Sequence, residues 1–176
     1  WVKGTLDDDF SKSMTGCDAL VHMAACGVSP QEASKEDLIK VNVIESYKLI
    51  QSAISNGINK FLIIGTSDEF GNSGDRFNFS SSDAPLEPIT GYAISKAKLF
   101  ELLKTLTDKE KLILIYARIF SAYGMGQHEK NLWPSMKKAA LSGKDFLLTP
   151  GEQIRSFIPV AKAAEKLVEL LNFSEV

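Results

Sequence analysis

The sequence contains few of the residues that build metal sites and disulfide frameworks. Its 176 residues include only two cysteines and two histidines. The spacing of Cys17 and Cys26 fits no common metal motif and gives no disulfide framework. We therefore expect no metal site, and two small apolar thiols in a reducing cytoplasm.

Long apolar runs and an excess of one charge are also missing. No run approaches the roughly 20 residues of a membrane-spanning helix, and no N-terminal segment has the pattern of a signal peptide. The formal net charge is −2 at pH 7, which gives no electrostatic reason to expect a nucleic acid or a membrane surface as a partner. With 44% hydrophobic and 24% charged residues, the composition is typical of one globular domain with a buried core.

A third absence concerns glycine. The twelve glycines nowhere form G-x-x-G-x-x-G or G-x-G-x-x-G, the patterns of a turn that holds a pyrophosphate against a helix N-terminus. The chain also begins at Trp1, inside a segment (1–6) whose pattern predicts a strand. We therefore expect that further residues precede Trp1 in the intact protein.

Apolar runs alternate with amphipathic segments along the chain. Continuous apolar runs predict buried strands over 17–25, 60–67 and 111–120, with a short strand over 145–149. Apolar residues at helical spacing predict helices over 35–56, 91–108, 131–142 and 160–172. This alternation is typical of an α/β fold with a doubly wound parallel sheet, a Rossmann-like architecture. Ligands bind such sheets beyond the carboxyl ends of the strands.

Tyr92 and Lys96 are the first candidates for catalysis. They are four residues apart in a predicted helix, so they share one face of it. A free tyrosine has a pKa of about 10, and about 4 kcal/mol of differential stabilisation is needed to bring it near 7. A nearby ammonium supplies part of that by favouring the phenolate. The pair alone is also compatible with two side chains on a helix surface. Residues elsewhere in the sequence are therefore needed to distinguish a catalytic pair from a surface pair.

Such residues lie at the end of the strand "KFLIIGTS". Thr66 ends this strand, where a hydroxyl would face the ligand crevice and bond the same substrate oxygen as Tyr92. Asp68 and Glu69 follow, and they are either part of a solvated turn or a second acid–base pair for the elimination of water.

The ordered series of motifs resembles a known family. The segments "HMAA", "GTSDEFG", "GYAISKAKLFE", "ARIFSAYG" and "GEQIRSFIPV" look like those of the extended short-chain dehydrogenases/reductases, within the NAD(P)-dependent sugar-nucleotide epimerases and dehydratases. The resemblance extends from about Val2 to about Leu171. It implies a partial Rossmann-like domain over 1–176, with part of the substrate-binding portion in 122–176, and without the first strand–helix–strand of the family.

The resemblance also implies roles for individual residues. Tyr92 would be the catalytic base, Lys96 its partner and a ligand of the nicotinamide ribose, and Thr66 the catalytic hydroxyl. The remaining cofactor contacts would come from Asp7, Ala24, Ala25 and Asn42. The nucleotide-diphosphate sugar would contact Ser121, Asn131, Leu132 and Arg155. A helix N-terminus and a planar guanidinium both suit a diphosphate.

Several residues depart from the family pattern. Dehydratases commonly carry Thr-Asp-Glu, whereas Ser67 separates Thr66 from Asp68 here. Ser121 occupies a position where many relatives have Asn, and Ser156 follows Arg155 where Asp is usual. Because the Gly-rich turn is absent, we expect these 176 residues alone to bind NAD or NADP weakly and to be inactive.

Two kinds of function remain open. The first is an enzyme that transiently oxidises C4 of a nucleotide-linked hexose and then epimerises, dehydrates or reduces it. The second is a truncated, non-catalytic member that serves as a binding or regulatory module. A strand and a Gly-rich turn encoded directly before Trp1 would favour the enzyme. The family resemblance also implies a homodimer formed through the helices 35–56 and 91–108.

Overall fold

Three parallel strands form the main sheet of the protein. The computed structural model describes residues 1–76 and 81–172. The strands β1 (Ala19–His22), β2 (Lys60–Thr66) and β3 (Ile113–Ile119) are paired in that order, with β2 in the centre. Both pairings are parallel, so the carboxyl ends of all three strands lie at the same edge of the sheet.

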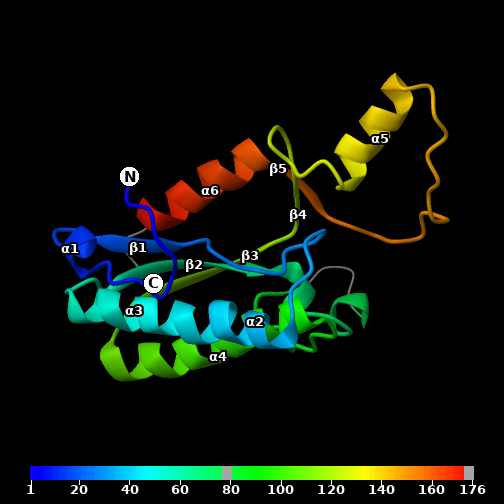
Figure 1. Cartoon of the computed structure of the whole chain (residues 1–176). Helices are drawn as coiled ribbons and strands as arrows, with labels where there is room; N and C mark the ends of the chain where they lie inside the picture. Colours follow the sequence, from blue (N-terminus) through cyan, green and yellow to red (C-terminus); the bar gives the residue numbers. More distant parts are fainter. Residues whose placement is uncertain (77–80, 173–176) are drawn as a thin grey trace.

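Helices cover both faces of this sheet. Figure 1 shows α3 (Ser46–Ser55) and α4 (Gly91–Glu110) on one face and α6 (Val160–Asn172) on the other. The main core lies between the sheet and the first two helices, and its buried members include Ile50, Ala53, Phe61, Ile63, Leu99 and Leu103. The doubly wound α/β fold predicted from the sequence is therefore confirmed. Within the described ranges, no helix has the length and apolar character needed to cross a membrane.

The helix predicted over 35–56 is continuous but not uniform. It consists of α2 (Lys35–Ile39), a π-helical segment η1 (Lys40–Glu45) and α3. The hydroxyl of Ser46 donates to the backbone oxygen of Val41 over 2.8 Å, a side-chain bond that lies within this widened turn. Because π-helical turns are often found at functional sites, η1 is a candidate part of the site, together with the strand ends.

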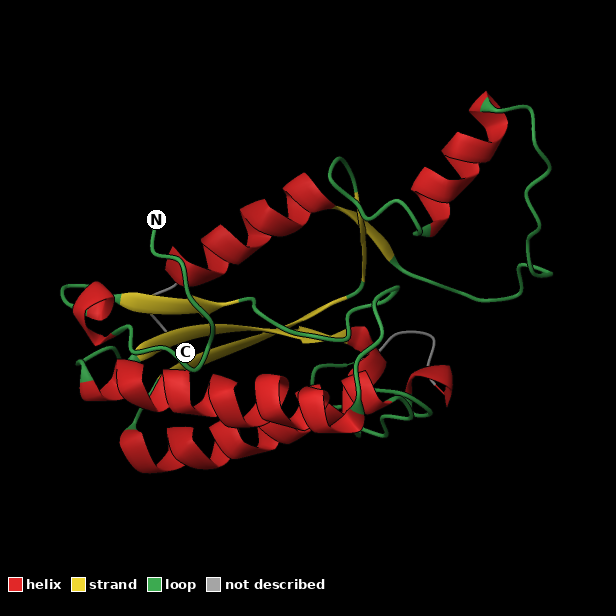
Figure 2. Cartoon of the chain, in the orientation of Figure 1, coloured by secondary structure: helices red, strands yellow, loops and turns green. Residues whose placement is uncertain are grey.

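The C-terminal third adds a second, smaller sheet. The strands β4 (Ser121–Tyr123) and β5 (Phe157–Pro159) pair in parallel. The helix α5 (Leu132–Leu141) agrees with the helix predicted over 131–142, and Figure 2 shows it and the loop after it extending away from the main sheet. Three short helices complete the described elements: α1 (Ser11–Met14), η2 (Ser67–Glu69) and η3 (Gly74–Arg76).

Two predicted strands do not form. Residues 1–6 and 145–149 have no regular strand in the structure. Their apolar side chains stay in solvent: Val2 is 65% exposed and Leu147 is 95% exposed. A strand requires a neighbouring strand for its backbone hydrogen bonds, and neither segment has one among the described residues.

The strand β1 lies at the edge of the sheet. It pairs with β2 on one side, and no described strand pairs with its other side. Val21 and Met23 beside this edge are 41% and 59% exposed. Such an open edge is a surface for further strand pairing.

Candidate active site

The first turns of α4 bring Tyr92 and Lys96 to the carboxyl edge of the sheet. Thr90 is the N-cap of this helix, and its hydroxyl oxygen accepts a hydrogen bond from the amide of Ala93 over 3.2 Å. Tyr92 is half-buried, whereas Lys96 is only 2% exposed. Among the described residues, neither the Tyr92 hydroxyl nor the Lys96 ammonium has a hydrogen-bond partner. A buried lysine side chain whose ammonium has no protein partner is costly unless water or a ligand binds that ammonium.

The electrostatics of Tyr92 differ from our expectation. Its pKa is raised to about 12, because burial and the carboxylates of Glu69 and Asp68 disfavour the phenolate. Burial lowers the pKa of Lys96, and the charge of Glu69 opposes that change. The Lys96 ammonium therefore does not lower the pKa of Tyr92 by itself, and a further positive charge is required to make Tyr92 a base near neutral pH.

Thr66 lies at the end of β2 and begins the short helix η2. Its hydroxyl oxygen accepts a hydrogen bond from the amide of Asp68 over 3.3 Å, while the carboxylate of Glu69 accepts one from the amide of Thr66 over 2.8 Å. This reciprocal arrangement is a capping box. Since the hydroxyl of Thr66 acts here only as an acceptor, its proton remains available for a substrate oxygen.

Glu69 does not occupy the position that we expected for it. Its side chain is fully buried, and its carboxylate pairs with Arg118 over 3.0 Å instead of facing the crevice. A carboxylate held in this way is poorly placed to exchange protons with a substrate, whereas Asp68 is exposed. The sequence did contain a signal for this structural role, because T-x-x-E is the pattern of a capping box.

Asn42 joins three segments beneath the site. Its side-chain oxygen accepts a hydrogen bond from the amide of Cys26 over 2.8 Å, and its nitrogen donates to the Cys26 carbonyl over 3.1 Å and to the Ser95 hydroxyl over 3.0 Å. Ser95 in turn donates to the carbonyl of Tyr92 over 2.7 Å. Asn42 thus fixes the loop after Ala24 and Ala25 to the turn of α4 that carries Tyr92.

Replacing Asn42 by leucine is expected to lower the free energy of unfolding by about 1–3 kcal/mol, because it leaves buried backbone groups of Cys26 without partners. Chemical denaturation would measure the loss. Asn56→Ala is the matched control, since Asn56 bonds only its own helix at an exposed position. Equal stability of the Asn42 and Asn56 variants would contradict this role.

His22 is a buried residue of the site that the sequence did not single out. Its Nε2 atom lies 2.9 Å from the Ser46 hydroxyl, and its pKa is lowered to about 4 by burial and by the charge of Lys96. His22 is therefore neutral near pH 7. The letters "HMAA" include it, but only the fold places it between the π-helical segment and Lys96.

The other predicted ligand residues lie farther from this centre in the fold. Asp7 is exposed and forms an ion pair with Lys48 in α3 over 3.6 Å. Ser121 begins β4, and Asn131 and Leu132 lie at the start of α5. Arg155 is exposed just before β5, where its Nε donates to the Gln153 side chain over 3.1 Å. The structure does not bring these residues into contact with Tyr92 or Lys96.

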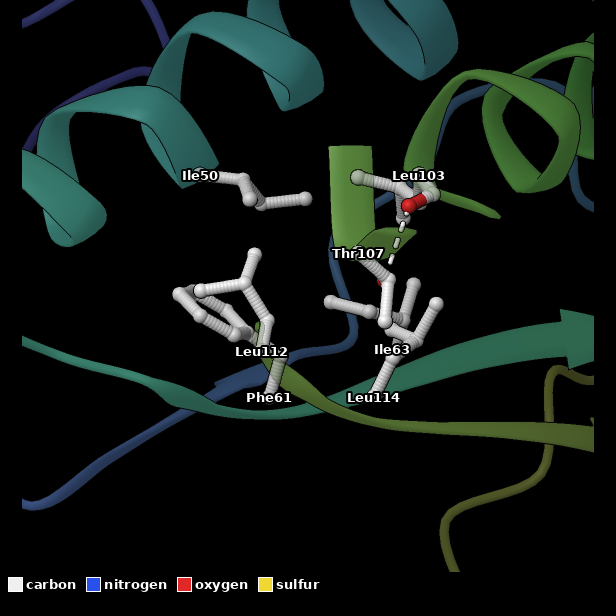
Figure 3. Close-up of a pocket in the computed structure, with 7 residues that line it drawn as sticks. All are labelled: Ile50, Phe61, Ile63, Leu103, Thr107, Leu112 and Leu114. Atoms are coloured by element: carbon white, nitrogen blue, oxygen red, sulfur yellow. Dashed lines mark hydrogen bonds between the residues drawn. The ribbon is translucent and has the colours of Figure 1, made fainter. Parts of the chain in front are cut away.

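An enclosed space in the core is separate from the candidate site. Figure 3 shows seven side chains around it, among them Phe61, Leu103 and Thr107. Its volume is about 10 Å³, and the single hydroxyl in its lining, that of Thr107, already donates to the Leu103 carbonyl over 2.8 Å. Because a space of this size holds at most one water molecule, it is a packing defect rather than a binding site.

Comparison with known proteins agrees with the motifs. The model of the "NAD dependent epimerase/dehydratase family" matches residues 2–175. A dTDP-D-glucose 4,6-dehydratase of Mus musculus is 26% identical over 142 residues, which cover 77% of this chain and 38% of that protein. The low-salt glycan biosynthesis protein Agl12 of Haloferax volcanii is 27% identical over 161 residues, which cover 90% of this chain and 51% of that protein.

Solved structures show the same fold. A UDP-glucuronic acid 4-epimerase from Bacillus cereus, in complex with UDP-4-deoxy-4-fluoro-glucuronic acid and NAD, superposes with a TM-score of 0.87 at 20% identity. The match covers 98% of this chain and 55% of the epimerase chain. The chain thus spans about half or less of the length of these relatives.

Proposed function

We propose that this chain, which belongs to the NAD dependent epimerase/dehydratase family, is the part of an NAD(P)-dependent sugar-nucleotide epimerase or dehydratase that carries the proton-transfer residues. One observation supports this proposal above all. Tyr92 and Lys96, whose polar groups have no hydrogen-bond partner among the described residues, lie in the first turns of α4, and Thr66 ends β2 at the carboxyl edge of the sheet with its hydroxyl acting only as an acceptor. Ligands of doubly wound folds bind at this edge.

The residues at this edge fit the nicotinamide half of a dinucleotide. The Lys96 side chain is buried, its ammonium has no partner among the described residues, and this ammonium would bind the ribose hydroxyls. The loop with Ala24 and Ala25 is held by Asn42 and presents small side chains along the cofactor's path. When bound, NAD or NADP would accept a hydride from the sugar and return it, and its positive ring would favour the phenolate of Tyr92.

The side chains of the protein would transfer the proton of the C4 hydroxyl. Tyr92 would take the proton of the C4 hydroxyl while the hydride leaves that carbon. Thr66 would donate a hydrogen bond to the same oxygen and orient it. Lys96 would hold the ribose and stabilise the phenolate, which its own charge cannot achieve alone against burial and two carboxylates.

The role of the exposed Asp68 carboxylate would distinguish dehydration from epimerisation and from net reduction at C4. If the reaction includes elimination of water, Asp68 is the remaining acid, and Asp68→Asn would slow elimination by about 10²–10⁴-fold. Oxidation at C4 would continue, because it depends on Tyr92. Formation of the 4-keto-6-deoxy product from dTDP-glucose, followed beside the spectrum of the reduced cofactor, would measure both steps.

Asp108→Asn, at an exposed position near the end of α4, is the control for this change. If Asp68→Asn left the turnover of the true substrate unchanged, elimination of water would be ruled out. Epimerisation or net reduction at C4 would then be the reaction.

The substrate would extend from this edge to the C-terminal third. We propose that 122–176 include part of the substrate-binding portion, with the nucleotide diphosphate of the sugar near Ser121, Asn131, Leu132 and Arg155. Asn131 is the N-cap of α5 and its side chain makes no capping bond, so it leaves the first amides of this helix available to an anion. Arg155→Ala would raise the KM for the sugar nucleotide more than it lowers kcat.

A homodimer would use the two long helical segments. Three apolar side chains on η1 and α4 are partly exposed, namely Ile44 at 48%, Ile94 at 37% and Leu102 at 42%. Burial of such side chains in a paired copy is favourable. Sedimentation of the intact protein would give a dimer mass, and Leu102→Glu would give a monomer. A monomeric wild type would contradict the dimer.

We also place the protein in a reducing cytoplasm, since Cys17 and Cys26 are free thiols.

The experiment that tests the function uses the intact protein. It should copurify with NAD or NADP, and it should convert a dTDP- or UDP-hexose. A non-catalytic binding or regulatory module is the second candidate function. Sugar-nucleotide binding without cofactor or turnover in the intact protein would favour this module.

A further inference from the structure

Glu69 is the centre of a buried polar cluster between β2, β3 and α4. One carboxylate oxygen accepts hydrogen bonds from the Thr66 amide over 2.8 Å and from the Tyr116 hydroxyl over 3.1 Å. The other accepts one from Nε of Arg118 over 3.0 Å. Catalysis by Tyr92 does not directly require the side chains of Glu69, Tyr116 or Arg118. This hydrogen-bond network therefore calls for another explanation.

The local structure makes room for this cluster. Gly65 lies directly before Thr66, and a side-chain carbon at this position would come within 2.3 Å of the Tyr116 ring and 2.6 Å of the Glu69 carboxylate. The guanidinium of Arg118 lies 4.4 Å from the centre of the Phe100 ring and 5.1 Å from that of Tyr116, which are favourable cation–π contacts. The Tyr116 and Glu69 side chains are therefore tightly fixed against β2.

Tyr116 connects this cluster to α4. Its hydroxyl lies 3.1 Å from the Glu69 carboxylate and also 3.1 Å from the backbone oxygen of Lys96. Both neighbours are acceptors, so the hydroxyl shares its one proton between them and must stay protonated. In agreement, burial and Glu69 raise the pKa of Tyr116 above its ordinary value. Tyr116 is thus no alternative to Tyr92 as a base.

We infer that Tyr116 is a positioning residue for the reaction: its hydroxyl ties the helix turn at Lys96 to the carboxylate that also holds Thr66. The two elements that carry Thr66 and the Tyr92–Lys96 pair then keep a fixed separation. A shift of about 1 Å between reacting groups costs about 100-fold in rate, so such a tie has a kinetic effect. The inference rests on the function proposed above.

The test compares Tyr116→Phe with Tyr47→Phe in the intact protein. Phenylalanine keeps the ring packing of Tyr116 and removes only the hydroxyl. Tyr47 is a matched control, because it packs against the same core and its hydroxyl has no hydrogen-bond partner among the described residues. We expect Tyr116→Phe to lower kcat about tenfold, the effect of one lost hydrogen bond, with KM nearly unchanged. The pH dependence of kcat should keep its midpoints, because the lost phenol is uncharged.

Hydrogen exchange gives a second measurement that needs no turnover. The Thr66 amide and the amides of the Lys96–Phe100 turn should exchange about tenfold faster in Tyr116→Phe and at the wild-type rate in Tyr47→Phe. Unchanged exchange at these amides, or a wild-type kcat with faster exchange, would overturn the inference. An intact wild type without cofactor binding or turnover would overturn the proposed function instead, and the wild-type measurement alone reveals that case.

Discussion

Tyr92→Phe in the intact protein should lower kcat by about 10²–10⁴-fold, the usual contribution of a positioned acid–base group. The change removes the hydroxyl that would exchange the C4 proton and leaves the ring in place. Tyr92 has no hydrogen-bond partner among the described residues, so the fold should not depend on its hydroxyl. KM for the sugar nucleotide should change only a few-fold. Steady-state kinetics with dTDP- or UDP-hexoses would give both constants.

Tyr47→Phe serves again as the control and should keep full activity. The thermal unfolding midpoint of both variants should match that of the wild type. A Tyr92→Phe variant with kcat within a factor of a few of the wild type would remove Tyr92 as the base. Lys96 and Thr66 would then have to act on another residue, and the proposed mechanism would fail.

Glu69→Gln should lower the free energy of unfolding by about 3–5 kcal/mol, the usual cost of breaking a buried ion pair. Glutamine keeps the size of the side chain but leaves the charge of Arg118 without a counter-ion. Arg118 is poorly placed to compensate, because its Nη2 atom is already buried without a hydrogen-bond partner among the described residues. Denaturant unfolding of the variant, at constant m-value, would measure this loss.

The exposed pair of Lys162 and Glu165 provides the control. Glu165→Gln breaks an ion pair of similar length in solvent, where screening leaves little to lose. Its unfolding midpoint should equal that of the wild type. Equal midpoints for Glu69→Gln and Glu165→Gln would mean that the buried ion pair adds nothing to the stability of the fold.

Local patterns determined most of the fold. The runs 60–67 and 111–120 are continuous and apolar because both faces of β2 and β3 are covered, so their sequence alone indicates a parallel sheet. The spacing of Tyr92 and Lys96 placed them on one face of a helix, and α4 has them there. In contrast, residues 1–6 and 145–149 have strand-like patterns without a partner strand, and pattern alone cannot supply one.

The candidate site could be predicted only in part from the sequence. Thr66, Tyr92 and Lys96 are predicted from motif order, because each lies at or near the end of its own element. The role of Glu69 depends on Arg118 and Tyr116, which lie in a strand about 50 residues away. The pKa of Tyr92 depends on burial and on the carboxylates of the short helix η2. Those effects arise from distances through space, and sequence spacing does not encode them.

The sequence by itself therefore determined the alternating elements and the family resemblance, and it predicted the acid–base residues, since these depend on local periodicity and order. Only the tertiary structure decided which of two adjacent carboxylates is buried and which one faces solvent. It also placed two carboxylates near Tyr92, which together with burial raise the pKa of that phenol. The physical reason is the same in both cases: the energy of a charge depends on its burial and on its neighbours in space.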